Sequence, residues 1–380
     1  VIGAKQIAQE TGRKNILTLD LGGTSNDVSL IQNGETKLFT DGKIGNYPCR
    51  QAMMDISTIG AGGGSIAWVD GGGWLRVGPH SAGSFPGPAC YGKGGTEPTY
   101  TDASLIMGYL RPDYFAGGEV ALDAELARKA IQEKVADVLD MGIYDAASAI
   151  HKIMHNQMAD QVRLATVKRG YDPRSFSVVA SGGAGPIAAC SLLKLLNFKE
   201  VIVPPTPGVM AALGLLSADI EHEEVVTFAA KIDEVDLQEL KAAIGEGKQL
   251  CGQERANVGI SENLLRTTYS AEMRYVGQSY ELEIPFPEAE GVLDKAAMEA
   301  VKERFHQRHE HVYKHAFRNL QIEFTAIRIL ISQKPVPTPR MEKVREGEWG
   351  VPGDKRRTYF DECKGWMESC LLYTSPSPRD

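Results

Sequence analysis

Residues 19 to 27 (LDLGGTSND) combine acidic, glycine and hydroxyl residues at the end of an apolar segment. The apolar run from Ile16 to Leu19 predicts a buried strand, and a second strand, Val28 to Ile31, turns back over it. Glycines at such a turn let a ligand approach the backbone, and its hydroxyl and N–H groups suit phosphate oxygens. Asp20 and Asp27 are candidate catalytic residues that suit a hydrated Mg²⁺, with Asp20 as the metal ligand. The predicted phosphate-binding residues are Gly22, Gly23, Thr24 and Ser25. An ordinary glycine-rich hairpin is the alternative interpretation.

A second strand, glycine turn and helix follow at residues 175 to 186 (SFSVVASGGAGP). Phe176 to Ala180 is predicted as a strand and Ile187 to Leu196 as a helix. The small residues leave room for a flat base or a ribose, and the helix N-terminus favours an anion. The predicted nucleotide-binding residues are Gly182, Gly183, Ala184 and Gly185. This turn is a weak signal alone and a more specific one when paired with the upstream loop.

The segment from Gly60 to Ser65 (GAGGGS) is the third dense glycine feature. Consecutive glycines are kept in a packed protein where no side chain fits or where φ is positive. We interpret this loop as a place where a ligand approaches the backbone, and a plain tight turn is the alternative. The ligand-binding candidates are Gly62, Gly63 and Gly64.

A long segment rich in glycine and proline runs from Gly78 to Asp102. Such segments in compact domains are usually functional or disordered, and the aromatic residues of this one argue against disorder. Asp102 at its end is a candidate catalytic acid, with the N-cap of the following helix as the alternative. Cys90 is either a nucleophile or, as we favour, a packed free thiol, because no Cys-His-Asn pattern accompanies it.

The elements that position these loops belong to an α/β pattern, in which two helices cover residues 122–139 and 145–169. His151 and His155 in the second helix are expected to be surface or capping residues, since the Glu of an HExxH site is missing. Four further histidines, at positions 306, 309, 311 and 315, do not all share one helical face, so we favour a solvated helix there, with a metal site as the alternative.

Size and composition are those of a globular protein with a large core. The chain has 380 residues, 43% of them hydrophobic, and a net charge of −8 that argues against a nucleic-acid binder. Its six cysteines form no CxxC pair, which favours a reduced, cytoplasmic protein without a disulfide framework. No apolar run is long enough for a membrane span.

Composition changes near Asp219 to Glu224, where acidic residues become frequent. We therefore predict an ATPase core over residues 1–218 and a smaller α+β domain over residues 219–335. Residues 336–380 are predicted as a linker and tail, of which about 362–380 are interpreted as non-native.

The opening loop DLGGTSNDVSLI resembles the second phosphate loop of the ATPase fold shared by actin, sugar kinases and heat-shock chaperones. The ordered set DLGGTSNDVSL, TIGAGGGSIAWVD, VGPHSAGSFPGPACYGKGGTEPTYTDA, SGGAGPIAA, VPPTPGVMAALGLLSAD and EMRYVGQSYEL then resembles the hydantoinase A, 5-oxoprolinase and acetone carboxylase family over about residues 1 to 335. The resemblance implies an actin-like α/β fold that is incomplete here, with residues 22–25 on phosphates and residues 182–185 on the adenosine side.

The same resemblance implies ATP and Mg²⁺ as cofactors and a hetero-oligomer with a hydantoinase B-like partner subunit. Three departures are visible. The family's first DxGGT loop is absent, which predicts an N-terminally truncated chain that is inactive alone. Ser57 stands where hydantoinase-like members often have His, and Ile187-Ala188 replaces a pair that often ends in His.

Our leading hypothesis from the resemblance is an ATP-dependent hydrolase subunit that activates a cyclic amide, of the hydantoin or lactam type, by phosphorylation. The alternative is a subunit of an ATP-dependent ketone carboxylase of the acetone or acetophenone type. A non-catalytic nucleotide-binding or assembly fragment is the third hypothesis.

Overall fold

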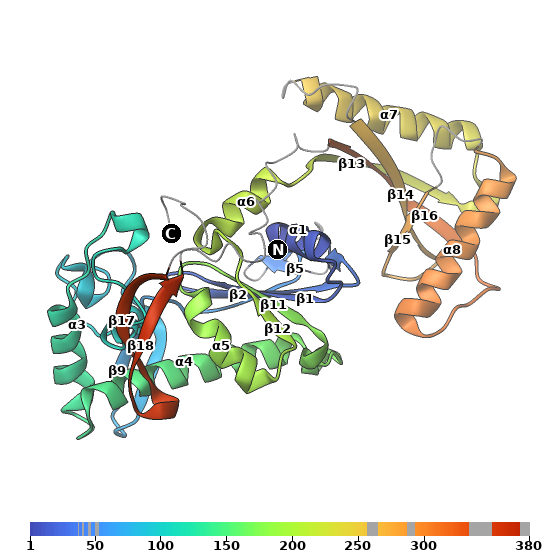
Figure 1. Cartoon of the computed structure of the whole chain (residues 1–380). Coiled ribbons are helices and arrows are strands. Elements are labelled where there is room, and N and C mark those ends of the chain that lie inside the picture. Colours follow the sequence, from blue (N-terminus) through green and yellow to red (C-terminus); the bar gives the residue numbers. More distant parts are fainter. Residues whose placement is uncertain are drawn as a thin grey trace. The chain divides into compact units, whose positions relative to one another are not determined.

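The computed structural model describes residues 1–36, 38–39, 42–44, 47–49, 53–256, 265–286, 293–333 and 352–372. The chain divides into two compact units (Figure 1). The first contains Val1–Ser217 together with the described residues after 351, and the second lies within Ala218–Thr338. In the part of the chain that the structure describes, no helix has the length and apolar character needed to cross a membrane.

A mixed sheet of six strands is the centre of the first unit. β1 runs parallel to β11 and forms an antiparallel hairpin with β2, which also pairs with β3 and β8. Because the parallel strands β1 and β11 end at the same edge, the turns that follow them meet there. In sheet order the strands are β12 (Glu200–Ile202), β11 (Ser177–Ser181), β1 (Ile16–Leu21), β2 (Asn26–Gln32) and β3 (Glu35–Thr36), with β8 (Ile56–Ile59) beside β2.

Alternate side chains of β1 enter two different apolar cores. Leu17, Leu19 and Leu21 belong to the larger core, which α4 (Ile143–Ala165) and α5 (Gly185–Leu196) complete. Ile16 faces the other way, into a smaller core formed with α1 (Ile2–Thr11) and α6 (Met210–Leu216).

Helices α1 and α6 touch through glycines. A Cβ atom at Gly214 would lie 2.6 Å from the backbone nitrogen of Gly3, so no side chain fits at this crossing. The sheet is therefore covered on both faces, as expected for an α/β protein.

A second group of elements in this unit packs on α4 and carries the long glycine- and proline-rich segment. It contains β9 (Ser65–Val69), β10 (Leu75–Ser81), α2 (Tyr100–Ile106), α3 (Ala124–Ile131) and the π-helical turn Gln132–Ala136. Short strands lie at β4 (Leu38–Phe39), β5 (Gly42–Ile44), β6 (Tyr47–Cys49) and β7 (Met53–Met54).

The stretch predicted as a linker and tail contains a β-hairpin, formed by β17 (Pro352–Phe360) and β18 (Gly365–Leu372). Tyr359 is buried in the larger core of the first unit, and Trp366 packs against that core. No local pattern in the sequence predicts this hairpin, because the residues that it packs against are more than 200 positions away in the chain.

The second unit is a four-stranded antiparallel sheet with two helices. The strand order is β13 (Ile220–Lys231), β16 (Ile322–Gln333), β14 (Leu265–Tyr275) and β15 (Leu282–Pro285), and the helices are α7 (Leu237–Ala256) and α8 (Lys295–Tyr313). The predictions of an α/β fold and of a smaller α+β unit after it are confirmed.

The expectation of a solvated histidine helix is wrong for two of its four residues. His306 and His309 of α8 are buried, and their rings pack around Tyr275. The Tyr275 hydroxyl bonds His306 Nδ1 at 2.9 Å, and His309 Nδ1 donates to the carbonyl of His315 at 2.8 Å. These histidines are therefore core residues whose Nδ1 atoms are hydrogen-bonded. Among the described residues, no group of three or more metal-binding side chains is close enough to hold an ion.

Candidate functional site

Four polar side chains form a row across the sheet, at the end where β1 stops. In the strand register Asp20 is opposite Ser181 on one side and Asp27 on the other, and Asp27 is opposite Thr58. Residues directly opposite each other in a sheet project from the same face. All four line one cavity of about 360 Å³ beside α1 and α6. The sequence predicted the two acids, whereas the two hydroxyl residues come from strands whose alignment only the structure gives.

The two carboxylates of this row repel each other. Burial and the nearby Asp27 charge raise the pKa of Asp20, and the Val1 ammonium and the Ser181 hydroxyl oppose this rise. The Thr58 hydroxyl donates to Asp27 Oδ1 at 2.5 Å. Among the described residues, neither carboxylate forms an ion pair with a lysine or arginine. Two acids without a lysine or arginine partner are a donor set that suits a divalent cation such as Mg²⁺, since it is bound through one or two carboxylates and several waters.

The turn after β1 is held by the glycine loop 60–65. Gly63 N–H donates to the Gly22 carbonyl at 2.9 Å, and Gly64 N–H donates to the Gly23 carbonyl at 2.7 Å. A Cβ atom at Gly62 would lie 2.5 Å from the backbone nitrogen of Thr24. Gly62 is therefore required for packing one loop on the other. The two glycines that follow it, Gly63 and Gly64, also line a cavity.

The turn after β11 supports the same hairpin from the other side. Gly182 has a φ of +81°, and a Cβ atom there would lie 2.3 Å from the Leu21 carbonyl and 2.6 Å from Asp20 Oδ1. Ala184 N–H donates to the same Leu21 carbonyl at 3.1 Å. Two glycine loops from distant parts of the chain thus hold the turn after β1, and Gly182 leaves space for the Asp20 carboxylate.

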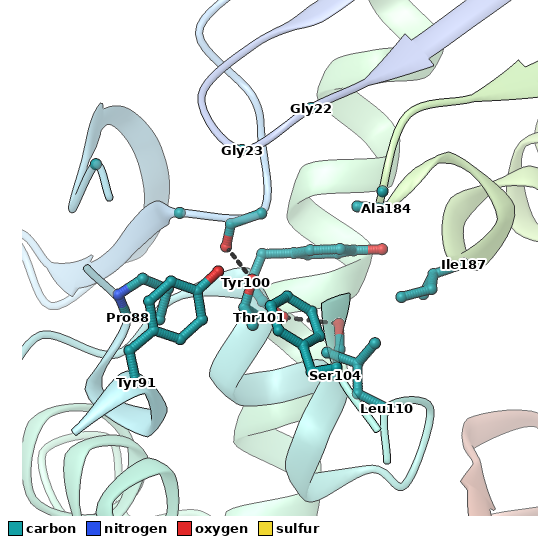
Figure 2. Close-up of a pocket in the computed structure, with 15 residues that line it drawn as sticks. Gly22, Gly23, Pro88, Tyr91, Tyr100, Thr101, Ser104, Leu110, Ala184 and Ile187 are labelled. Carbon is teal, nitrogen blue, oxygen red and sulfur yellow. Dashed lines mark hydrogen bonds between the residues drawn. The ribbon is translucent and has the colours of Figure 1, made fainter. Parts of the chain in front are cut away.

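A second cavity of about 210 Å³ lies where these loops meet α2 and α5 (Figure 2). Its residues come from three glycine loops, the long segment and both helices, and most of its walls are apolar. They are Gly22, Gly23, Gly63, Gly64, Gly83, Pro88, Tyr91, Tyr100, Thr101, Ser104, Leu110, Phe115, Gly183, Ala184 and Ile187. Half-buried Tyr91 and Phe115 have ring centroids 5.8 Å apart.

Two buried histidines stand behind the floor of this cavity. The hydroxyl of Tyr100 bonds His155 Nε2 at 2.9 Å, and Ser104 Oγ bonds His151 Nε2 at 3.0 Å. Burial lowers the pKa of His155 to about 4 and that of His151 well below its usual value, so both rings are neutral at pH 7. The expectation that they are surface or capping residues is wrong, because both lie on the buried face of α4.

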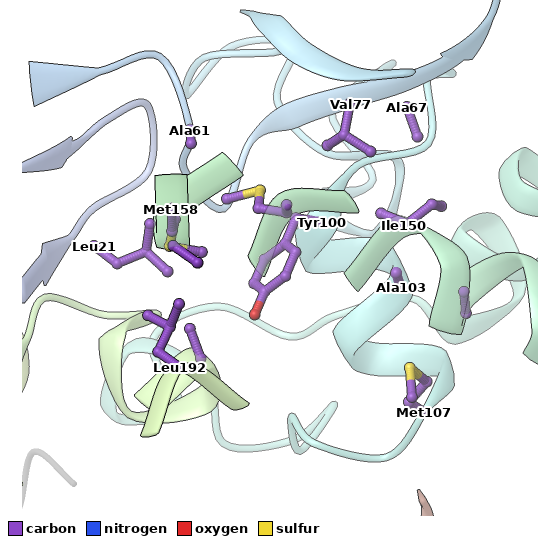
Figure 3. Packing of buried hydrophobic residues seen from close by; sticks show 14 of the residues in the cluster. Leu21, Ala61, Ala67, Val77, Tyr100, Ala103, Met107, Ile150, Met158 and Leu192 are labelled. Atoms are coloured by element: carbon purple, nitrogen blue, oxygen red, sulfur yellow. The ribbon is translucent and has the colours of Figure 1, made fainter. Parts of the chain in front are cut away.

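The proton of Ser104 decides the tautomer of His151. Ser104 Oγ donates to the carbonyl of Tyr100 at 2.8 Å, and a hydroxyl has one proton. His151 therefore donates from Nε2, and its buried Nδ1 is left without a hydrogen-bond partner. Figure 3 shows the ring of Tyr100 among apolar residues of the larger core, including Met158 and Leu192. Tyr100 is thus a floor residue fixed by its neighbours.

Asp102 is fully buried at the start of α2 and lines neither cavity. It forms a capping box with Thr99 and accepts the N–H groups of Ala89 and Cys90. This placement favours the capping interpretation over the catalytic one, because the carboxylate closes the long segment onto the helix.

Cys90 is also fully buried, and burial together with the Asp102 charge raises the pKa of its thiol. A thiol in this state is inert as a nucleophile, so the packed-thiol interpretation fits the structure.

The predicted residues therefore divide into three groups. Asp20 and Asp27 line the first cavity, and Gly22, Gly23, Gly63, Gly64, Gly183 and Ala184 line the second. The residues that line neither are Thr24, Ser25, Gly62, Asp102, Gly182 and Gly185. Sequence reasoning missed Tyr91, Tyr100, Ser104 and Phe115. A signal for two of them was available, since Tyr100 and Ser104 are spaced i and i+4, as are His151 and His155.

Comparison with protein families matches both units. The hydantoinase/oxoprolinase model matches residues 1–224, and the model of the hydantoinase/oxoprolinase C-terminal domain matches residues 228–367. Caprolactamase subunit alpha from Pseudomonas jessenii is 33% identical over 96% of the chain and 53% of its own length. The acetophenone carboxylase gamma subunit from Aromatoleum aromaticum is 40% identical over 58% of the chain and 30% of its own length.

Two solved structures share the fold. The nucleotide-free structure of acetone carboxylase superposes with a TM-score of 0.84 at 28% identity. Acetone carboxylation by that enzyme is ATP-dependent. The ATP-dependent caprolactamase from Pseudomonas jessenii superposes with a TM-score of 0.69 at 32% identity. Each comparison covers 98% of this chain and 54% of the other. The chain thus spans about half the length of these proteins.

Proposed function

Because the chain belongs to the hydantoinase/oxoprolinase family, we propose that it binds ATP within an enzyme that activates a cyclic amide by phosphorylation. The observation that carries the proposal is the pair of facing carboxylates, Asp20 and Asp27, next to a glycine turn that two other loops hold in place. Acidic residues beside exposed backbone N–H groups match the needs of a metal-bound phosphate chain.

In this proposal the nucleotide uses both cavities. The second cavity takes the base, since its walls are aromatic and aliphatic. Ala184 and Ile187, at the predicted adenosine side, are among its lining residues. The phosphates follow the turn from Gly22 to Ser25, toward the acidic row. Asp20 and Asp27 would hold Mg²⁺, which neutralises phosphate charge when it is bound.

The chemistry follows from the poor reactivity of an amide. Transfer of the terminal phosphoryl group of ATP to the carbonyl oxygen releases ADP and gives an O-phosphorylated imidate. Water adds to its carbon, and the C–N bond then breaks with protonation of the nitrogen, which opens the ring as an acyl phosphate. A second water hydrolyses the acyl phosphate to a carboxylate and free phosphate. Catalysis of such a transfer depends on positioning and charge neutralisation and not on a covalent protein intermediate. A fixed turn and an acidic row supply positioning without a nucleophilic side chain, which agrees with the inert Cys90 thiol.

The names of the relatives support the substrate class and the assembly. One relative is a subunit of a caprolactamase, and caprolactam is a cyclic amide. Its designation as an alpha subunit supports a hetero-oligomer, for which we propose a hydantoinase B-like partner. A cytoplasmic location is part of the same proposal.

A ketone carboxylase subunit is the second candidate. It is favoured by the 40% identity to the acetophenone carboxylase gamma subunit and by the superposition on acetone carboxylase. Both candidates use the same phosphate chemistry, so the acceptor distinguishes them.

The test is ATP hydrolysis by the intact protein with its partner subunit. Stimulation by a hydantoin or a lactam, without bicarbonate, is the expected result. Stimulation by a ketone that requires bicarbonate would establish the carboxylase instead. Absence of both ATP binding and ATP hydrolysis would contradict the two enzyme hypotheses and leave an assembly role.

A further inference from the structure

The β17–β18 hairpin contacts the segment that forms one wall of the second cavity. This segment follows α2 and runs from Met107 to Phe115, and its members Leu110 and Phe115 line the cavity. The contacts join residues more than 240 positions apart in the chain. Both hairpin residues lie within the part of the chain that the family models match.

Strand β17 supplies donors to two carbonyls of the segment that follows α2. Tyr359 N–H donates to Met107 O at 2.9 Å, and Arg356 Nη2 donates to Tyr109 O at 3.2 Å. The carbonyl of Met107, the C-cap residue of α2, has no partner within the helix, so the bond from Tyr359 completes the helix C-terminus. The backbone approach is close, because a Cβ atom at Gly108 would lie 2.5 Å from the Arg357 carbonyl.

Ring packing continues from the hairpin to the cavity floor. Phe360 contacts Tyr109 with ring centroids 6.2 Å apart, and Tyr109 contacts His151 at 5.4 Å. His151 stacks on Tyr100 at 4.3 Å, and Tyr100 forms part of the floor. The hairpin therefore touches the wall segment directly and reaches the side chains behind the floor through Tyr109.

Aromatic contacts attach the hairpin to the rest of the unit. Tyr359 stacks on Tyr144 of α4 at 5.4 Å, and the ring of Trp366 meets Tyr144 edge-on at 5.2 Å. Two ion pairs, Lys152 with Asp361 and Lys194 with Glu362, involve exposed side chains and contribute little. The attachment of the hairpin thus depends mainly on Tyr359 and Trp366, and the ion pairs of Asp361 and Glu362 are secondary.

We infer that the β17–β18 hairpin is a positioning element that holds residues 107–115 in the conformation that binds the nucleotide base. The inference rests on the proposed function, since it takes the second cavity as the base site. Its physical basis is preorganisation: a wall segment ordered before binding does not lose conformational entropy when the ligand arrives. Tyr359 and Gly108 act through the wall and do not touch the ligand.

Two matched pairs of variants test this. Gly108→Ala forces the wall and hairpin apart, whereas Gly118→Ala introduces a similarly unfavourable residue at a φ of +87° with nothing closer than 3.7 Å. Tyr359→Ala removes the ring that stacks on Tyr144, whereas Tyr359→Phe keeps it. The readouts are amide hydrogen exchange over residues 107–115 and the Kd for ATP with Mg²⁺.

We expect Gly108→Ala and Tyr359→Ala to lose exchange protection over residues 107–115 and to raise the Kd for ATP by about tenfold. Gly118→Ala and Tyr359→Phe should stay close to the wild type in both readouts. Unchanged protection in Gly108→Ala and Tyr359→Ala would overturn the contact's role in holding the wall. Lost protection with an unchanged Kd would overturn its role in binding.

A failure of the proposed function gives a different pattern. If the wild-type protein does not bind ATP, the base site and the hairpin's effect on affinity are both overturned. Hydrogen exchange would still decide whether the hairpin orders the wall, because that readout needs no ligand.

Discussion

Asp20 and Asp27 face each other across the β1–β2 pair, on the side of the sheet that α1 and α6 cover. Like charges in this position destabilise a sheet by roughly 0.2–1 kcal/mol. Such a destabilising pair is expected where both charges serve a ligand. The adjoining glycine turn suggests that this ligand is a phosphate group with its metal. The Asp20–Asp27 pair is therefore expected to lower stability and to serve the proposed function, and the two effects can be measured separately.

Asp20→Asn should stabilise the metal-free protein at pH 7 by roughly 0.5 kcal/mol. The pKa of Asp20 is raised, so the folded state favours the protonated form; its stabilising effect is complete below 3.8 and is lost as the pH rises through the folded value. Urea unfolding at pH 7 and pH 3 measures this, and the gain should disappear at pH 3. A difference in free energy of unfolding between Asp20→Asn and the wild type that is the same at pH 7 and pH 3 would show that the carboxylates do not repel.

Mg²⁺ should raise the melting temperature of the wild type, because a cation that binds only the folded state stabilises it. Asp20→Asn should remove most of that rise, and Asp172→Asn, which changes an exposed acid in a local pair with Arg174, should not. A melting temperature in the wild type that does not respond to Mg²⁺ would argue against a metal site in the free protein.

Gly182→Ala should destabilise the protein by about 2 kcal/mol or more, because the new Cβ atom meets the Leu21 carbonyl and the residue keeps a φ of +81°. Gly183→Ala is the matched control, since nothing lies within 4 Å of its Cβ position. Chemical denaturation of both variants checks the prediction. Similar stabilities for the two would mean that the loop can move away from β1.

His155→Gln should flatten the acid side of the stability profile. The pKa of His155 is lowered from 6.5 to about 4 by burial, so the neutral ring contributes stability above 6.5 that is lost as the pH falls through about 4. The wild type should lose on the order of 3 kcal/mol more than the variant over this range. Parallel profiles from urea unfolding between pH 7 and pH 4 would contradict a neutral buried ring.

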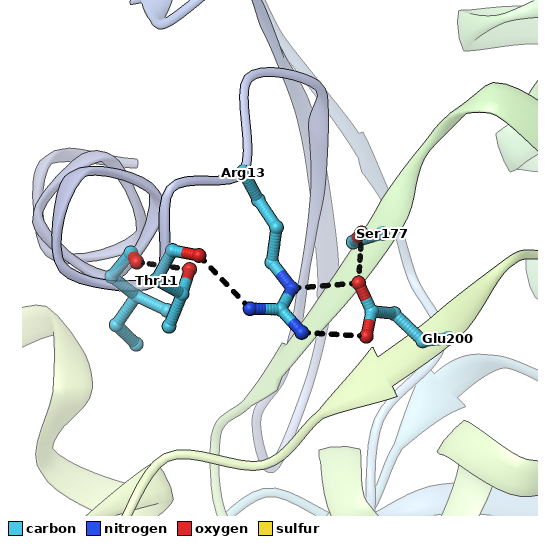
Figure 4. Close-up of polar contacts among 5 residues, drawn as sticks. Thr11, Arg13, Ser177 and Glu200 are labelled. Carbon is cyan, nitrogen blue, oxygen red and sulfur yellow. Dashed lines mark hydrogen bonds and ion pairs between the residues drawn. The ribbon is translucent and has the colours of Figure 1, made fainter. Parts of the chain in front are cut away.

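Arg13→Ala should cost about 1 kcal/mol, because a bidentate pair with Glu200 joins the start of β1 to the start of β12 (Figure 4). The Ser177 hydroxyl donates to the same carboxylate at 2.7 Å, and these contacts lower the pKa of Glu200 to about 2. Arg174→Ala is the control, because its bidentate pair with Asp172 is local and exposed. Thermal unfolding should separate the two variants, and equal melting temperatures would rule out a special role for the Arg13 pair.

Much of the fold was predictable where the signal is local. The apolar run before Asp20, the turn after it and the strand that returns define the β1–β2 hairpin, and a hairpin places Asp27 opposite Asp20. The three glycine loops were also recognisable. Their different purposes were not, because only neighbouring backbone atoms show that Gly62 and Gly182 leave space for the hairpin whereas Gly183 borders a cavity.

The remainder depends on contacts between distant segments. Tyr100 and Ser104 become floor residues because α2 packs against His151 and His155 of α4, and each helix alone reads as an ordinary amphipathic element. Asp102 shows the opposite case, since a cap and a catalytic acid share one sequence pattern and differ only in their hydrogen bonds. The hairpin after residue 351 gave no signal because its partner carbonyls lie near residue 108.

In the proposed function, Asp20 and the turn that follows it serve phosphoryl transfer. The direct measurement is ATP turnover by the intact protein with its partner subunit, comparing the wild type with Asp20→Asn after equal folding has been established by circular dichroism. We predict a loss of turnover on the order of 100-fold or more, because the substitution removes a charge that holds the metal at the reacting phosphate. Turnover unchanged from the wild type would contradict the assignment of this loop to phosphate binding.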